Sequence, residues 1–132
     1  MKLFISKITL FLVLLQSCSL LEADYGTKKV FKGINLYYTK NVTELEVNKL
    51  GEYLLTKPGF SDGSKADIQL NKVDKTYEYR IPIKKGLEQD KEVIDRYKFI
   101  ARDLSKNVFN DSPVDVHLCD DRLQTLRVVV AN

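Results

Sequence analysis

A histidine and a cysteine two positions apart offer the clearest chance of chemistry in this 132-residue chain. His117 and Cys119 occupy alternate positions of the segment VDVHLC, and Asp115 stands two residues before the histidine. On a β-strand such alternate side chains point to the same face, about 6 to 7 Å apart along the chain. Imidazole, thiolate and carboxylate can together hold a soft metal ion such as zinc or copper. One hypothesis is therefore a metal- or small-ligand-binding site at His117 and Cys119.

The supply of ligands argues against this hypothesis. The chain has one histidine and two cysteines, whereas a structural zinc site takes four ligands. A cysteine–histidine nucleophile on a flat strand also lacks a cleft and oxyanion donors, so packing of Cys119 near the strand end is the alternative. No glycine-rich phosphate loop, GxSxG, HExxH or CxxC motif occurs. We expect a non-enzymatic protein with no cofactor.

Local signals place the elements that would position these residues. Thr43-Glu44-Leu45-Glu46 reads as a capping box that begins a helix, which Pro58-Gly59 ends. A second helix begins near Asp90, carries one apolar stripe and ends at residues 110–113. Alternating apolar residues predict three hairpins, formed by residues 30–31 with 34–38, 66–71 with 77–83, and 114–119 with 126–130.

The order of elements predicts an α+β fold. The sequence ββ-α-ββ-α-ββ contains a βαββαβ centre, the ferredoxin-like pattern. We therefore expect a two-layer sandwich in which two helices cover one face of an antiparallel sheet, with extra hairpin strands at both ends. Residues 30–132 would form this single domain.

If the apolar alternates face the helices, the polar alternates share the open face of the sheet. In that case the candidate interaction face comprises Tyr37, Gln69, Glu78, Arg80, Asp115, His117 and Arg127, with Asn35, Asp67 and Cys119 beside them. A surface tyrosine such as Tyr37 could anchor a partner, or it could pack across strands on Arg80. The alternative for the whole face is a solvated surface of paired polar side chains without a function.

The N-terminus predicts export and lipidation. Lys2 and Lys7 flank the start of a short apolar core, as in a secretory signal, and this core is too short to cross a bilayer. Leu15-Gln16-Ser17-Cys18 resembles a bacterial lipobox, so residues 1–17 would be a lipoprotein signal peptide, Cys18 the lipidated residue and 18–29 a tether. Ser19 indicates export to the outer membrane. Ordinary cleavage after Ser19 is the alternative.

Charge and cysteine content agree with an exported, lipid-anchored protein. Removing residues 1–17 takes away two lysines and leaves 19 basic against 18 acidic residues, so nucleic acid is not an expected partner. If Cys18 is lipidated or removed, Cys119 is the remaining thiol and no internal disulfide can form.

Three stretches resemble a recurrent, uncharacterised domain of exported bacterial proteins. They are LYYTKNVTELEVNKLGEYL, GFSDG and NVFNDSPVDVHLCDDRLQTLRVVV, and the resemblance runs over about residues 26–130. Ser61 stands where that family has a second aromatic residue. The resemblance implies a bacterial exported domain and brings with it no activity or catalytic residue.

The leading hypothesis is a lipoprotein domain that is anchored to the bilayer through Cys18. It would bind another envelope or extracellular protein through the open sheet face or an edge strand. The rival hypothesis is the metal- or small-ligand-binding domain that uses His117 and Cys119.

Overall fold

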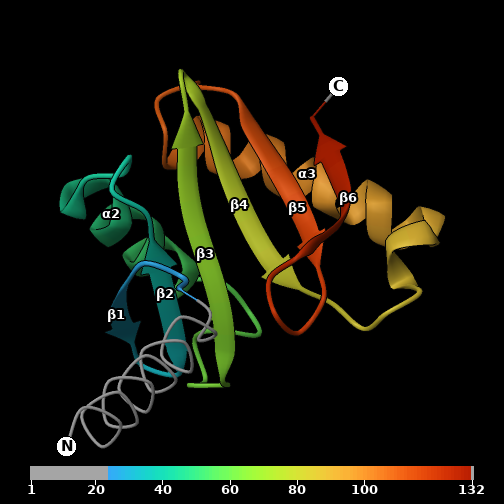
Figure 1. Ribbon diagram of the computed structural model, residues 1–132, viewed down its shortest axis with the longest axis horizontal. Helices are drawn as coiled ribbons and strands as arrows, with labels where there is room; N and C mark the ends of the chain where they lie inside the picture. The colour runs from blue at the N-terminus through green and yellow to red at the C-terminus, as the bar shows by residue number, and fades with distance from the viewer. Residues whose placement is uncertain (1–23, 132) are drawn as a thin grey trace, which may run out of the picture.

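Six strands form one mixed sheet, and two α-helices cover one of its faces (Figure 1). The computed structural model describes residues 24–131. The predicted signal peptide and the first half of the predicted tether, residues 18–23 with Cys18, lie outside this range. The elements in chain order are β1 (Thr27–Phe31), β2 (Ile34–Tyr38), α2 (Glu44–Leu54), β3 (Ala66–Val73), β4 (Thr76–Pro82), the 3-10 turn η1 (Leu87–Gln89), α3 (Lys91–Asn107), β5 (Val114–Cys119) and β6 (Thr125–Val130).

Both helices begin at the caps that the sequence predicts. The Thr43 hydroxyl accepts from the Glu46 amide at 3.2 Å, and the Glu46 carboxylate accepts from the Thr43 amide at 2.9 Å. The Asp90 carboxylate accepts from the amides of Glu92 and Val93. Each cap satisfies amides that have no partner inside the helix, so both predicted helix starts are confirmed.

The order of strands in the sheet differs from the expectation. The strands lie side by side in chain order, β1 to β6. The pairs β2/β3 and β4/β5 are parallel, and the other three pairs are antiparallel. The α+β class is confirmed, whereas the ferredoxin-like, all-antiparallel arrangement is not, because both the strand order and the two parallel pairs depart from it.

The helices explain the parallel pairs. Each helix is the crossover between two neighbouring parallel strands, a connection that needs a dozen or more residues. Both crossovers advance in the same direction across the sheet, and such connections are right-handed. They therefore lay α2 and α3 on the same face, which leaves the other face open.

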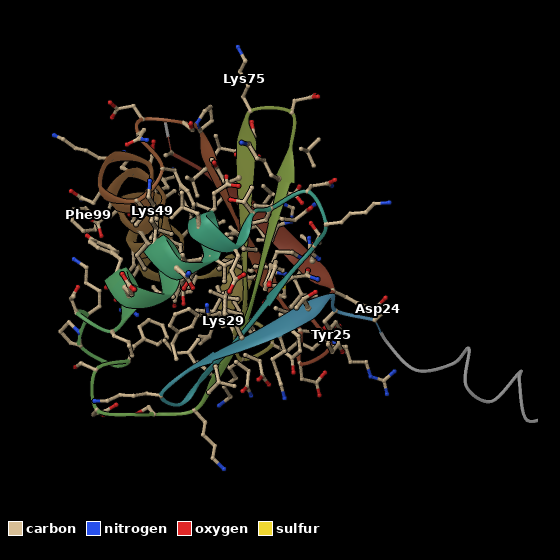
Figure 2. All side chains as sticks on the ribbon, turned by 90° about the vertical axis from the view of Figure 1, so that its left-hand side faces the viewer. Asp24, Tyr25, Lys29, Lys49, Lys75 and Phe99 are labelled. Carbon is tan, nitrogen blue, oxygen red and sulfur yellow. The ribbon has the colours of Figure 1, made fainter. Side chains whose placement is uncertain are left out.

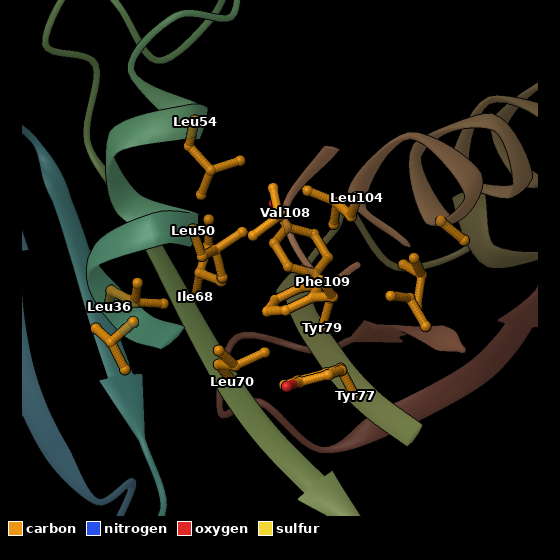
Figure 3. Packing of buried hydrophobic residues seen from close by; sticks show 14 of the residues in the cluster. Leu36, Leu50, Leu54, Ile68, Leu70, Tyr77, Tyr79, Leu104, Val108 and Phe109 are labelled. Atoms are coloured by element: carbon orange, nitrogen blue, oxygen red, sulfur yellow. The ribbon is translucent and has the colours of Figure 1, made fainter. Parts of the chain in front are cut away.

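The core fills the space between the helices and the sheet (Figure 3). Alternate strand residues point toward the helices, and the apolar stripes of α2 and α3 meet them. The buried cluster includes Leu36, Ile68, Leu70, Tyr79 and Val116 from the strands and Val47, Leu50, Leu54, Ala101 and Leu104 from the helices.

The turn between β1 and β2 is fixed by contact with a distant loop. A Cβ atom at Gly33 would overlap the carbonyl oxygens of Gly63 and Ser64. The Gly33 carbonyl accepts from the Ala66 amide at 3.1 Å, where β3 begins. Gly33 therefore lets the connection from α2 close against the first hairpin.

Within the described residues 24–131, neither helix has the length and apolar character that a membrane crossing requires.

Candidate functional site: the open sheet face and the β6 edge

The strand register brings most of the predicted face residues together. Gln69 lies opposite both Tyr37 and Arg80, Glu78 lies opposite Asp115, and Arg80 lies opposite His117. Apolar residues of the same strands occupy the alternate positions and pack under the helices. The open face is therefore a continuous row of polar side chains, as expected, on Tyr37, Gln69, Glu78, Arg80, Asp115 and His117.

His117 is the centre of a closed hydrogen-bond network. Its Nδ1 lies 3.2 Å from Nη1 of Arg80 and 2.9 Å from Oγ1 of Thr125. A guanidinium group can only donate, so Nδ1 acts as the acceptor and the ring proton sits on Nε2. Nε2 lies 3.3 Å from a carboxylate oxygen of Glu78, but it is buried and forms no hydrogen bond of good geometry.

The loop before β6 encloses this network. The carbonyl of Leu123 accepts from Nη2 of Arg80 at 2.7 Å, and the Leu123 side chain is buried. His117 is consequently buried as well, although the sequence pattern placed it in water. The difference arises because the loop between β5 and β6, which alternation along the strands does not describe, folds back onto this end of the face.

The surroundings keep the His117 ring neutral. Burial lowers its pKa, the Glu78 carboxylate raises it, and the Arg80 charge lowers it again; the balance is a pKa below the ordinary histidine value. A neutral ring agrees with the acceptor role of Nδ1. Nδ1 is thus engaged within the protein, and Nε2 is buried beside Glu78. Neither nitrogen is directed at an open ligand position.

Cys119 is fully buried and is not poised for reaction. Burial raises the pKa of its thiol above the ordinary value, so the thiol form dominates and the nucleophilic thiolate is scarce. Among residues 24–131, no group of three or more histidine, cysteine, aspartate or glutamate side chains is arranged to hold a metal ion. The geometry gives no support to a site at His117 and Cys119.

We predict that His117 makes the fold less stable in acid. Because its pKa is lower in the folded chain than in the unfolded chain, the unfolded state binds the proton first. The contribution of His117 to the free energy of unfolding is therefore fully present above about pH 6.5. It falls on acidification by at most about 1.4 kcal/mol per pH unit, the limit for one proton. Urea unfolding of His117→Gln between pH 7 and pH 5 should show a smaller loss than the wild type. An equal loss in both proteins would contradict this account of the network.

The other end of the open face is covered by the segment that precedes β1. The rings of Tyr25 and Tyr37 pack edge to face, with centroids 5.4 Å apart. The Gln69 amide donates to the Tyr25 carbonyl at 2.9 Å. Tyr37 thus packs on Tyr25, not on Arg80, and both predicted residues at this end already have partners within the chain.

Arg127 does not share this face. It lies opposite Leu118, on the side of the helices, and its guanidinium donates to the Glu88 carbonyl at 3.4 Å. A register shift next to Leu118 and the loop at residues 120–124 set this orientation. Val128 and Val130, which were expected to face inward, lie opposite His117 and Asp115 on the open face and are exposed by 44% and 46%. Leu126, at the register shift, is exposed by 37%.

Sequence reasoning missed these three residues because the strand is ambiguous. Val128, Val129 and Val130 are all apolar, so the face toward the helices is apolar whether the odd-numbered or the even-numbered residues point inward. In the structure Val129 is the buried member and lies opposite Val116. Arg127 gave the opposite signal, because a charged residue between the apolar neighbours Leu126 and Val128 favours an exposed arginine on the open face.

The two edges of the sheet differ in character. β1 has the sequence TKKVF, and its adjacent lysines are the kind of residue that protects an edge strand from pairing. β6 has the sequence TLRVVV, with no proline or lysine. Its outer backbone groups and exposed apolar stripe lie together. We call Leu126, Val128 and Val130, with the free edge of the strand, the β6 edge.

Comparison with known proteins identifies the family of this chain. A family model for an N-terminal domain matches residues 28–130, nearly all of the chain that the structure describes. No curated protein and no solved structure matches the chain. The match confirms that this domain recurs in an uncharacterised family, and it bears neither on export nor on lipidation.

Proposed function

The chain belongs to the AF_1994_N family, whose model covers a family N-terminal domain, and from this premise we propose that it is an exported, membrane-anchored lipoprotein that binds another envelope protein. It acts without enzymatic chemistry. The partner contributes an extended segment that pairs with the β6 edge. The observation that carries this proposal is the unprotected apolar edge strand.

The β6 edge has what strand addition requires. Backbone amides and carbonyls on the outer side of an edge strand supply affinity, and alternate side chains supply specificity. Val128 and Val130 project from one side of β6 at this alternating spacing, and Leu126 adds exposed apolar surface at the register shift. The predicted polar face contributes less, because its side chains pair with one another. A partner strand at β6 would bury apolar surface that the chain leaves in water.

The sheet order suits an anchor at the N-terminus. β1 and β6 form opposite edges of the sheet (Figure 1), about 24 Å apart for five strand spacings of about 4.8 Å. Eight residues separate Cys18 from β1. A lipid on Cys18 would hold the β1 side near the bilayer and leave the β6 edge on the far side, where a partner can reach it.

Photocrosslinking in cells tests the proposed edge. A photoreactive residue in place of Val128 should trap one defined protein, whereas the same residue in place of Val30, which is 57% exposed on β1, should not. Adding Val130→Lys should reduce the Val128 adduct about tenfold, because a charge at this position disfavours pairing and costs about 1.4 kcal/mol. Equal trapping from both edges, or an adduct that survives Val130→Lys, would refute strand addition at β6.

Metabolic labelling tests the anchor. Cells that make the full chain should incorporate a palmitate analogue into it, and Cys18→Ala should abolish the label, since the lipid would be carried on that residue. Cys119→Ala serves as the matched control and should keep the label, because Cys119 is a buried thiol. Label that persists in Cys18→Ala would rule out lipidation at this position.

A further inference from the structure

A groove of about 330 Å³ lies between α2 and α3, on the face of the sheet that the helices cover. Its walls are mainly apolar and include five aromatic rings, those of Tyr53, Phe60, Tyr79, Tyr97 and Phe99. Pockets for small molecules have volumes of about 300 to 1,000 Å³, with apolar walls and a few polar groups that orient the ligand. The groove has the size and the lining of such a pocket.

Tyr79 supplies a polar group without a partner. It stands on β4 with 2% of its surface exposed and forms part of the groove wall. No residue in the range 24–131 forms a hydrogen bond with its hydroxyl. Among residues 24–131, the fully enclosed side-chain polar atoms without a partner are Arg80 Nε and His117 Nε2. The Tyr79 hydroxyl is not one of them, so its oxygen can be reached from the groove that the residue lines. Burial also raises the pKa of Tyr79, so the hydroxyl keeps its proton and can donate it.

The rim of the groove offers no net charge. The ammonium of Lys57 lies 3.5 Å from a carboxylate oxygen of Asp103 and sits over the ring of Tyr53 at 4.6 Å. The Tyr53 hydroxyl donates to the same carboxylate at 2.8 Å. The two opposite charges therefore neutralise one another, and an ion that entered the groove would lose its water without gaining a free counter-charge.

We propose that this groove binds an uncharged, largely apolar small molecule whose single oxygen atom accepts a hydrogen bond from Tyr79. The aromatic walls bury the apolar part of the molecule. Phe99 forms an outer wall: it projects from α3 at the periphery of the molecule (Figure 2) and is 65% exposed. This proposal is independent of the β6 edge, which lies on the other side of the sheet.

Titration with 1-octanol tests the proposal. Chemical shifts of the full chain should change in a saturable way at groove residues, and octanoate and octylammonium should bind at least about tenfold more weakly because each carries a charge into an apolar site. Absence of saturable 1-octanol binding, or equal binding of the charged analogues, would overturn the proposal.

Two variants distinguish binding in the groove from non-specific binding of 1-octanol to apolar surface. Tyr79→Phe should weaken 1-octanol binding about three- to tenfold, the effect of one hydrogen bond. Phe99→Ala should also weaken binding. Leu45→Ala is its matched control, since Leu45 is likewise 65% exposed but lies outside the groove. Unchanged affinity in both groove variants, or an equal loss in Leu45→Ala, would refute the site.

Discussion

Replacing Leu50 by alanine is expected to lower the free energy of unfolding by about 3 kcal/mol. Leu50 is fully buried on the inner side of α2, within the core cluster beneath the helix (Figure 3). Its truncation removes apolar contacts and leaves a cavity. The helix is tied at its start by the capping box and cannot easily move to fill the space. Urea unfolding followed by circular dichroism measures the loss.

Leu45 provides the control on the same helix. It lies five residues earlier and is 65% exposed, so Leu45→Ala should change the free energy of unfolding by less than about 0.5 kcal/mol. The two variants remove the same atoms from the same helix and differ only in burial. Equal losses would show that α2 does not pack on the sheet through the stripe that contains Leu50.

Features that depend on neighbours in the sequence were predictable. The caps at Thr43 and Asp90 need only residues two or three positions later, and both form as expected. Pro82 cannot donate to a ladder, and it is the last residue of β4. In each case the physical cause acts within one turn or one strand.

The pairing of strands could not be read in the same way. Alternation tells which side chains face the helices but not which strand lies next to which. In the structure Leu36 lies opposite Ile68 in a parallel pair, yet the same two residues would face the core equally well in an antiparallel sheet. The direction and order of strands depend on how each crossover packs over the sheet, which the pattern does not encode.

The candidate site shows the same division. Glu78, Arg80 and His117 share one face, as strand alternation predicts. Their mutual pairing and the burial of His117 depend on Thr125 and Leu123, which arrive through the loop before β6. The orientation of β6 was predicted wrongly, because successive valines satisfy either alternation and Arg127, expected on the open face, lies opposite Leu118 on the helix side.

These contacts change which surface is free for a partner. A polar side chain that already has a partner gains little from a second protein, since new hydrogen bonds replace existing ones. The exposed apolar side chains of the β6 edge have no such compensation, and neither do its outer backbone groups. The expected interaction surface therefore moves from the middle of the open face to its outer strand.

Hydrogen exchange at the β6 edge tests the central claim most directly. Amide exchange would be measured on the full chain alone and in complex with the protein trapped at Val128. Amides of Thr125–Val130 should exchange at least about tenfold more slowly in the complex. Amides of Thr27–Phe31, at the opposite edge, should keep their exchange rates. Unchanged exchange in β6, with slowing confined to other strands or to the helices, would contradict the claim that a partner pairs with this strand.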